Sequence, residues 1–297
     1  MLIRLYSTLL LILAAAGAGA DPQGDATGRI RNLCERIGAK LDSVTVEDCL
    51  SDGLVDSGAS SRNQTVLAYR DIAPSGPAEA RVLLVGGIHG DEFSSVSIVF
   101  KWLELLRHNA DPRFEWRVVP LLNPDGLLMP PEQSRRMNAD GVDLNRNFPT
   151  DNWEAEAWDY WVNMAQRSER RYPGPSPLSE PETAWLAAQI DSFHPDAVVS
   201  VHAPYGVVDC DGPDQPPSKL GPLELQLLGT YPGSMGRYVG INKGIPMLTV
   251  ELESAEHMPT ARDANAIWQD MVDWLDARIG RQGKLAATGA TRPATLD

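Results

Sequence analysis

Residues 81–92 read RVLLVGGIHGDE, and this stretch decides the fold. Its first part, 81–87, is a continuous apolar run, which is typical of a strand buried on both faces of a sheet. The residues that follow, 92–107, carry apolar side chains at helical spacing. A buried strand that passes through a glycine-containing turn into an amphipathic helix is the repeating unit of α/β proteins. The stretch therefore predicts a strand, a tight turn and a helix of an α/β domain.

The alternation continues along the chain. Further strands are predicted at 65–69, 117–122, 197–201 and 247–252, and further helices at 180–192, 223–228 and 261–278. Ser179 is the expected N-cap of the helix at 180–192, with Pro181 in its first turn. The pattern predicts an α/β fold with a mixed, mostly parallel twisted sheet and helices on both faces. Functional sites of such sheets form outside the carboxyl ends of the strands.

Two histidines and a glutamate stand at such strand ends. His89 and Glu92 follow the strand at 81–87, with Gly90 allowing a tight turn between them, and His202 follows the strand at 197–201. Imidazole and carboxylate suit zinc, and three protein ligands with a fourth position open to water are typical of a catalytic site. Alone, the pair His89 and Glu92 is a weak indication, because a helix-capping glutamate beside a core histidine has the same spacing.

Glu251 lies within the apolar strand MLTVEL, where a carboxylate is costly unless it is hydrogen-bonded or used. Its functional interpretation is a general base that takes a proton from zinc-activated water. Glu253 competes for this role, because residues 251 and 253 point to the same side of a strand. Alternation alone leaves both open.

The segment 136–149, RMNADGVDLNRNFP, offers two guanidinium groups and several amides in a short span. An arginine can bind a carboxylate through two hydrogen bonds or stabilise an oxyanion. An ordinary charged surface loop is the alternative interpretation.

Six motifs occur in a fixed order: HGDE (89–92), NPDG (123–126), GVDLNRNFP (141–149), YPGPSPLSEPET (172–183), VVSVH (198–202) and LTVELE (248–253). As a set they resemble the M14 family of zinc carboxypeptidases, and within it the murein peptide amidase A branch. The resemblance covers about residues 80–280. It implies that His89, Glu92 and His202 bind one zinc ion per chain.

The resemblance also implies roles for the other matching positions. Asp143 matches an acid that hydrogen-bonds a ligand histidine, which is reasonable because such a partner fixes the imidazole tautomer. Arg136 matches the arginine that polarises the scissile carbonyl, and Glu251 matches the general base. The remaining matches concern the substrate: Asn145 and Arg146 correspond to a pair that binds a carboxylate, and Tyr231 is a candidate for a mobile tyrosine that covers it.

The implied activity is hydrolysis of an amide bond in murein peptides, at the γ-D-glutamyl–meso-diaminopimelate linkage of free peptides or of peptidoglycan stem peptides. One alternative is an N-acyl amino acid deacylase of the aspartoacylase and succinylglutamate desuccinylase type, which shares the His-x-x-Glu motif. Others are a zinc-free peptidoglycan-binding module and an ordinary carboxypeptidase acting on L-peptides. The intact zinc-ligand set and Glu251 argue against the binding module.

The amino-acid composition excludes two classes of binding partner. Of 297 residues, 43% are hydrophobic, and 26 basic against 40 acidic residues give a formal net charge of −14. A nucleic-acid binder needs a basic face to neutralise phosphates, so nucleic acid is not an expected partner, and neither is an anionic membrane. Residues 1–20 have a short positive start, an apolar run and a small-residue cleavage pattern, which predicts a signal peptide and export, to the periplasm if the source is a diderm bacterium.

The predicted domain organisation consists of an N-terminal extension, a catalytic domain and a tail. Residues 21–64 are expected to form an N-terminal extension in which Cys34 and Cys49 pair in an oxidising compartment, leaving Cys210 single. Residues 65–282 are the expected catalytic domain, and 283–297 the expected disordered tail.

Overall fold

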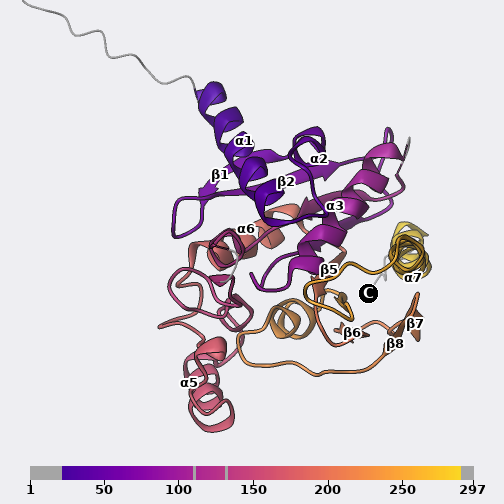
Figure 1. Ribbon diagram of the computed structural model, residues 1–297. Helices are drawn as coiled ribbons and strands as arrows, with labels where there is room; N and C mark the ends of the chain where they lie inside the picture. Colours follow the sequence, from indigo (N-terminus) through magenta and orange to yellow (C-terminus); the bar gives the residue numbers. More distant parts are fainter. Residues whose placement is uncertain (1–21, 110–111, 131–132, 289–297) are drawn as a thin grey trace, which may run out of the picture.

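The computed structural model describes residues 22–109, 112–130 and 133–288, which build one nine-stranded sheet with helices packed on it (Figure 1). The strands are β1 (Val55–Ser60), β2 (Val66–Ile72), β3 (Arg81–Val85), β4 (Glu115–Val119), β5 (Ala197–His202), β6 (Val207–Asp211), β7 (Lys219–Leu220), β8 (Leu223–Leu225) and β9 (Met247–Glu251). The α-helices are α1 (Pro22–Lys40), α2 (Val46–Ser51), α3 (Phe93–His108), α4 (Pro124–Leu127), α5 (Trp153–Asp159), α6 (Pro181–Phe193) and α7 (Ala261–Thr288). Shorter 3₁₀- and π-helical turns are η2 (Leu144–Arg146), η3 (Tyr160–Met164), η4 (Glu169–Arg171) and η5 (Arg237–Asn242).

The strand order confirms the predicted mixed sheet. In space it is β1-β2-β4-β3-β5-β9-β6-β8-β7. The four central strands β4, β3, β5 and β9 run parallel, while β2 joins β4 and β6 joins β9 in antiparallel pairs. The central strands are the continuous apolar runs of the sequence, as expected for strands covered on both faces.

Alternating side chains of each central strand face two separate apolar clusters. On β3, Val82 and Leu84 pack with α1, α2, α3 and α7, whereas Leu83 and Val85 pack with α6 and η5. Neighbouring side chains of a strand point to opposite faces, so a strand without polar residues supplies both clusters. The prediction of helices on both faces is therefore confirmed.

The N-terminal segment is tied to this sheet. A disulfide joins Cys34 of α1 to Cys49 of α2, as predicted. Strand β1 pairs antiparallel with β2, and the Ser61 hydroxyl donates a 2.7 Å hydrogen bond to Asp125 at the start of α4. The proposed boundary at residues 64 and 65 stays a prediction, and the sheet is continuous across it.

Three expectations about local structure were wrong. The segment 223–228, expected to be helical, contains strand β8, which pairs with β6 and β7. The N-cap of α6 is Glu180 rather than Ser179, whose hydroxyl donates to the Glu180 carboxylate instead. Helix α7, expected to end at 278, continues to Thr288, because the lysine, leucine and alanines of 284–287 favour helix, while the expected tail at 283–297 stays a prediction.

Two further predictions concern the ends of the chain. The expected signal peptide at 1–20 and the last part of the expected tail, 289–297, lie outside the described residues. Within the described part, no helix combines the length and the apolar character that a membrane crossing requires.

Candidate active site

Three neighbouring strands end at the same edge of the sheet and bring the predicted residues together. His89 and Glu92 follow β3, His202 ends β5, and Glu251 ends β9. In the pairing of β5 with β9, His202 and Glu251 are direct partners. Parallel strands that lie side by side present their carboxyl ends together, so the topology alone places these residues at one point.

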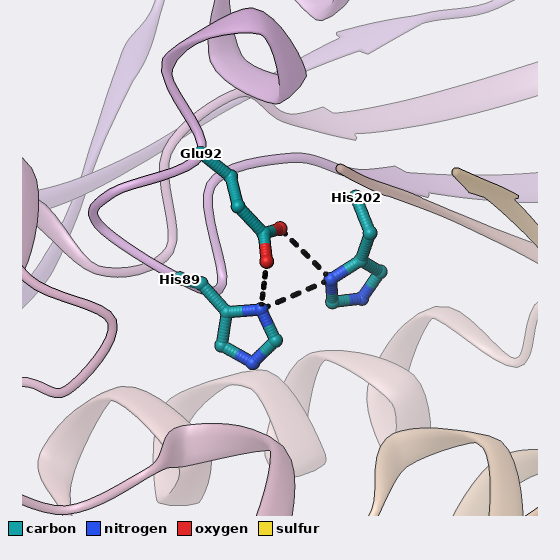
Figure 2. Close-up of side chains that lie close together, drawn as sticks. All are labelled: His89, Glu92 and His202. Atoms are coloured by element: carbon teal, nitrogen blue, oxygen red, sulfur yellow. Dashed lines mark hydrogen bonds and ion pairs between the residues drawn. The ribbon is translucent and has the colours of Figure 1, made fainter. Parts of the chain in front are cut away.

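His89, Glu92 and His202 converge on one another from two strand ends (Figure 2). One Glu92 carboxylate oxygen lies 2.7 Å from His89 Nδ1, and the other lies 3.1 Å from His202 Nδ1. The two Nδ1 atoms are 3.2 Å apart, and all three side chains are buried. Burial by itself raises the pKa of a carboxyl, but the two histidines outweigh it and hold the pKa of Glu92 below its ordinary value.

Asp143 supports the His89 ring at its second nitrogen, Nε2. Its carboxylate lies 3.3 Å from His89 Nε2 and accepts a 2.9 Å hydrogen bond from Arg136 Nε. Asp143 is fully buried; burial alone would raise its pKa, but Arg136 and His89 lower it, so the carboxylate is charged. A charged acid beside Nε2 favours the tautomer with a proton there and a free lone pair on Nδ1 of His89.

These residues fit a zinc ion. Their donor atoms, two imidazole Nδ1 atoms and a carboxylate, all lie within 4.8 Å of one another. Two histidines and one acid are a donor set of catalytic zinc sites, and the Asp143 contact supplies the outer support that such ligands require. Arg136 Nη1 lies 3.2 Å from His89 Nδ1, and a lone pair that binds a cation cannot also accept this hydrogen bond. Metal binding would therefore leave Arg136 Nη1 available to a substrate.

The structure distinguishes the two candidate glutamates. Glu251 is only 7% exposed and borders the same cavity as His89, Glu92 and His202, whereas Glu253 lies beyond the end of β9 and is exposed. Oxygen Oε2 of Glu251 has no hydrogen-bond partner among the described residues. Burial raises the pKa of Glu251, which makes the carboxylate a stronger proton acceptor.

The cavity in front of these residues has a volume of about 460 Å³. Asn145, Arg146 and Tyr231 all border it, as their predicted substrate-binding roles require. The Arg146 guanidinium lies 4.5 Å from the centre of the Tyr231 ring, a cation–π contact. Arg146 is 4% exposed and its Nε has no partner among the described residues, so the cavity wall presents a buried cation to an incoming anion.

Backbone packing fixes the turn that carries His89 and Glu92. A Cβ on Gly90 would collide with the backbone of Gly126 and Leu127, so the close approach of this turn to α4 requires glycine. Asn123 secures the same approach, since its Nδ2 donates to the Arg136 carbonyl at 3.1 Å and its Oδ1 accepts from Gly126 N at 2.9 Å. The NPDG motif thus joins the turn that carries His89 and Glu92 to the segment that carries Arg136.

The start of α6 fixes the other end of that segment. Asn138 donates hydrogen bonds of 2.6 Å to Glu180 and 3.2 Å to Glu182. Asn138 Oδ1 in turn accepts from the backbone of Asp140 and Val142. The SEPET motif therefore orients the loop between Arg136 and Asp143, and among the described residues its side chains form no hydrogen bond with His89, Glu92 or His202.

Sequence reasoning assigned no role to two arginines of the cavity and two acids of β6. They are Arg170, Arg171, Asp209 and Asp211. The two arginines lie in an irregular segment without periodicity, so the sequence carried no indication of their position. The two acids could have been found, because Val-Val-Asp-Cys-Asp after His202 places them on one face of a strand.

The central strands of the sheet are parallel, and their carboxyl edge carries a buried His-Glu-His group and a glutamate. This combination is typical of one class of protein, the zinc-dependent peptide hydrolases. The sequence matches the zinc carboxypeptidase family, Peptidase_M14, over residues 53–208. The chain belongs to this family, whose members depend on zinc, and it is a hydrolase.

Among curated relatives, Murein peptide amidase A of Escherichia coli (strain K12) is 37% identical over 182 residues, which cover 56% of this chain and 68% of the relative. Murein peptide amidase A of Vibrio campbellii (strain ATCC BAA-1116) is 32% identical over 187 residues, covering 59% of this chain and 70% of the relative. Bovine thrombin-activatable fibrinolysis inhibitor, a solved structure, is 17% identical with a TM-score of 0.57, covering 88% of this chain and 97% of that one. This last likeness supports the fold.

Proposed function

We propose that the protein hydrolyses an amide bond in murein peptides, at the γ-D-glutamyl–meso-diaminopimelate linkage. The single observation that carries the hydrolytic part is Glu251, a buried carboxylate with one unpartnered oxygen that faces a cavity shared with His89, Glu92 and His202. The murein part rests on the relatives, two of which are named Murein peptide amidase A.

Zinc would be held by His89, Glu92 and His202. When bound there, it supplies Lewis acidity, which polarises the scissile carbonyl and makes water a better nucleophile at neutral pH. Asp143 keeps the His89 ring in the tautomer that such binding needs.

Glu251 moves the proton. Its unpartnered oxygen accepts a proton from the attacking water, and the raised pKa lets it keep that proton until the amine leaves. The same side chain then donates the proton to the leaving nitrogen. Arg136, held through its Nε by Asp143, directs its Nη1 toward the negative charge that develops on the carbonyl oxygen.

Arg146, Asn145 and Tyr231 would position the peptide. The buried guanidinium of Arg146 binds a substrate carboxylate, and the Tyr231 ring packed on it limits its orientation. The Asn145 side-chain oxygen accepts from Met235 N at 2.8 Å, which fixes the amide and directs its nitrogen away from that bond, toward a ligand.

The proposed site of action is outside the cytoplasm, in the periplasm. Its support is the signal-like sequence of residues 1–20 together with the disulfide between Cys34 and Cys49, since disulfides persist in oxidising compartments. There the enzyme would meet free murein peptides or the stem peptides of the cell wall.

A mass-spectrometric assay tests the proposal. Zinc-loaded protein is incubated with L-Ala-γ-D-Glu-meso-diaminopimelate, with an all-L tripeptide, and with each peptide after chelation. We expect chelator-sensitive release of diaminopimelate from the first peptide alone. Cleavage of the all-L peptide alone would contradict the murein assignment, and release of a carboxylic acid from an N-acyl amino acid instead would indicate the deacylase.

A further inference from the structure

A cluster of aromatic side chains lies on the segment that follows the motif GVDLNRNFP, and the proposed reaction does not use it. Trp158 on α5 and Trp161 on η3 have ring centres 5.1 Å apart. The ring of Tyr172 lies 6.3 Å from the first and 5.0 Å from the second. We call these three residues the aromatic platform. It stands outside the active-site cavity, whose lining among the described residues includes none of the three rings.

The platform is open to solvent and held in place by its own packing. Trp158 is 45% exposed, and Met164 at the end of η3 is 71% exposed. Trp161 Nε1 donates a 2.9 Å hydrogen bond to the Ser168 carbonyl, which fixes its ring. Figure 1 shows α5 at the outer edge of the molecule, apart from the sheet. A packed and partly exposed tryptophan offers a flat apolar face to a ligand at little further cost in ordering.

The platform is continuous with the cavity along two routes. Tyr160 of η3 lies 5.4 Å from Tyr231 between ring centres, and Tyr231 packs on Arg146 in the cavity wall. On the second route, Arg171 borders the cavity and directly precedes Tyr172 of the platform. An extended tripeptide spans about 10 Å. A peptide with its carboxylate on Arg146 therefore reaches the platform with its other end.

Polar groups surround the exposed rings. Asn163 Nδ2 donates a 2.6 Å hydrogen bond to Asp159 Oδ1, and both side chains are exposed beside Trp158. The Arg167 guanidinium lies 5.9 Å from the centre of the Trp161 ring. Carboxylate, amide and guanidinium groups hydrogen-bond hydroxyl groups, while an aromatic ring covers an apolar C–H face. A sugar ring combines both features, whereas the anionic surface of a membrane would be repelled by the Asp159 carboxylate.

We propose that the aromatic platform binds the glycan chain of peptidoglycan, so that the substrate is a stem peptide still attached to that chain. The proposal rests on the proposed function for the peptide in the cavity. Sugar rings pack on Trp158 and bond Asp159 and Asn163 through their hydroxyl groups, and the stem peptide enters the cavity past Arg171. Of free peptides and cell-wall stem peptides, the platform selects the second.

Binding to peptide-free glycan tests the platform without any cleavage. Zinc-loaded full-length Glu251→Gln is co-sedimented with insoluble peptidoglycan whose stem peptides have been removed by an amidase. Adding Trp158→Ala should weaken this binding about 5- to 30-fold, the range for truncation of an aromatic residue at the centre of an interface. Trp158→Phe should retain more of the binding, because it keeps a ring at this position.

The control is Leu105→Ala, which trims an apolar side chain of α3 that is 39% exposed. It should leave glycan binding unchanged. Trp158 is 45% exposed, so Trp158→Ala should keep the fold, as thermal unfolding checks. Asn163→Ala, at an exposed position of η3, should also weaken binding and tests the platform should Trp158→Ala unfold early.

A kinetic comparison tests the link between the platform and the cavity. The protein with Glu251 intact is assayed on free L-Ala-γ-D-Glu-meso-diaminopimelate and on the same tripeptide attached to soluble glycan chains. We expect a higher kcat/KM for the attached peptide. The ratio of the two values should fall toward 1 in Trp158→Ala and stay unchanged in Leu105→Ala.

The outcomes separate this proposal from the proposed function. Cleavage of the free tripeptide by a protein that binds no glycan, or binds it equally well in Trp158→Ala, would overturn the platform and leave the proposed function standing. Glycan binding that depends on Trp158, in a protein that cleaves neither peptide, would support the platform and contradict the proposed function. Binding to phosphatidylglycerol vesicles in place of glycan, lost in Trp158→Ala, would overturn the proposal in favour of a membrane.

Discussion

At the residue scale, Glu251 and Glu253 show how position decides chemistry. They are two residues apart, yet Glu251 is buried with an unpartnered oxygen and Glu253 is exposed. The sequence could not separate them by alternation. The structure separates them, because β9 ends at Glu251 and residue 253 lies beyond the end of the strand.

The first prediction uses this pair. Glu251→Gln keeps the shape of the side chain but removes its basicity, so kcat should fall by about 10²- to 10⁴-fold. Zinc content, measured by mass spectrometry of the metal, should stay at one per chain because Glu251 is not among the ligands. Glu253→Gln is the control and should retain activity. Turnover that survives in Glu251→Gln would refute the assignment of the base.

A second residue-scale prediction concerns Asp143. Asp143→Asn weakens the support of His89 and releases Arg136, so zinc affinity should fall by about 10- to 100-fold. Competition with a chromophoric chelator measures this. Asp140→Asn, in the same loop but exposed and paired with Arg62, should leave the affinity unchanged. Equal affinities in wild type and Asp143→Asn would show that the contact with His89 is without effect on the metal.

At the element scale, Glu182 in the first turn of α6 makes the stability of the fold depend on pH. Glu182 accepts hydrogen bonds from Arg62 N and Asn138, but burial raises its pKa to about 7 from an ordinary 4.5. The folded protein therefore keeps this proton longer than the unfolded chain does. The contribution of Glu182 to the free energy of unfolding is therefore greatest below pH 4.5, and it falls as the pH rises from 4.5 to 7.

Glu182→Gln tests that dependence. The rise in the pKa of Glu182 from 4.5 to about 7 corresponds to on the order of 3 kcal/mol of unfolding free energy. The variant should therefore lose clearly less unfolding free energy than wild type between pH 5 and about 7.5. Urea titrations across this range provide the measurement. Glu154→Gln on α5, which is exposed, serves as control. Parallel curves for wild type and Glu182→Gln would mean that this carboxyl is charged in the fold throughout.

Prediction from the sequence also succeeded or failed element by element. The strands that bear His89, His202 and Glu251 were found because a buried parallel strand is an unbroken apolar run. Strand β8 was mistaken for a helix because its apolar positions, Leu223 and Leu225, are few, and its strand form depends on pairing with β6. Tertiary pairing of this kind leaves little trace in so short a segment.

At the scale of the whole molecule, the disulfide between Cys34 and Cys49 joins α1 to α2 and stabilises the fold by constraining the unfolded chain. It closes a loop with a sequence separation of 15, worth roughly 3 kcal/mol in the chain-entropy treatment. Replacing both cysteines by serine should lower the free energy of unfolding by that order, as measured in urea. An unchanged midpoint would contradict this. Thiol titration should find one reactive thiol, Cys210, in the unfolded oxidised chain and three after reduction.

The same scale shows what sequence reasoning could not reach. The order of motifs identified the family and the three residues of the His89, Glu92 and His202 group, because each motif carries its chemistry locally. The two acids of β6 were missed, because they lie far from the motifs in the sequence and reach the cavity only through the pairing of β6 with β9. Such long-range placement is set by the folded sheet.

A crystal structure of zinc-loaded Glu251→Gln with L-Ala-γ-D-Glu-meso-diaminopimelate, recorded at the zinc edge, tests the central claim most directly. We predict one anomalous peak bound by His89, Glu92 and His202, with the γ-D-glutamyl carbonyl beside it and a peptide carboxylate on Arg146. Zinc bound elsewhere, or a peptide seated outside the cavity, would contradict the proposed site.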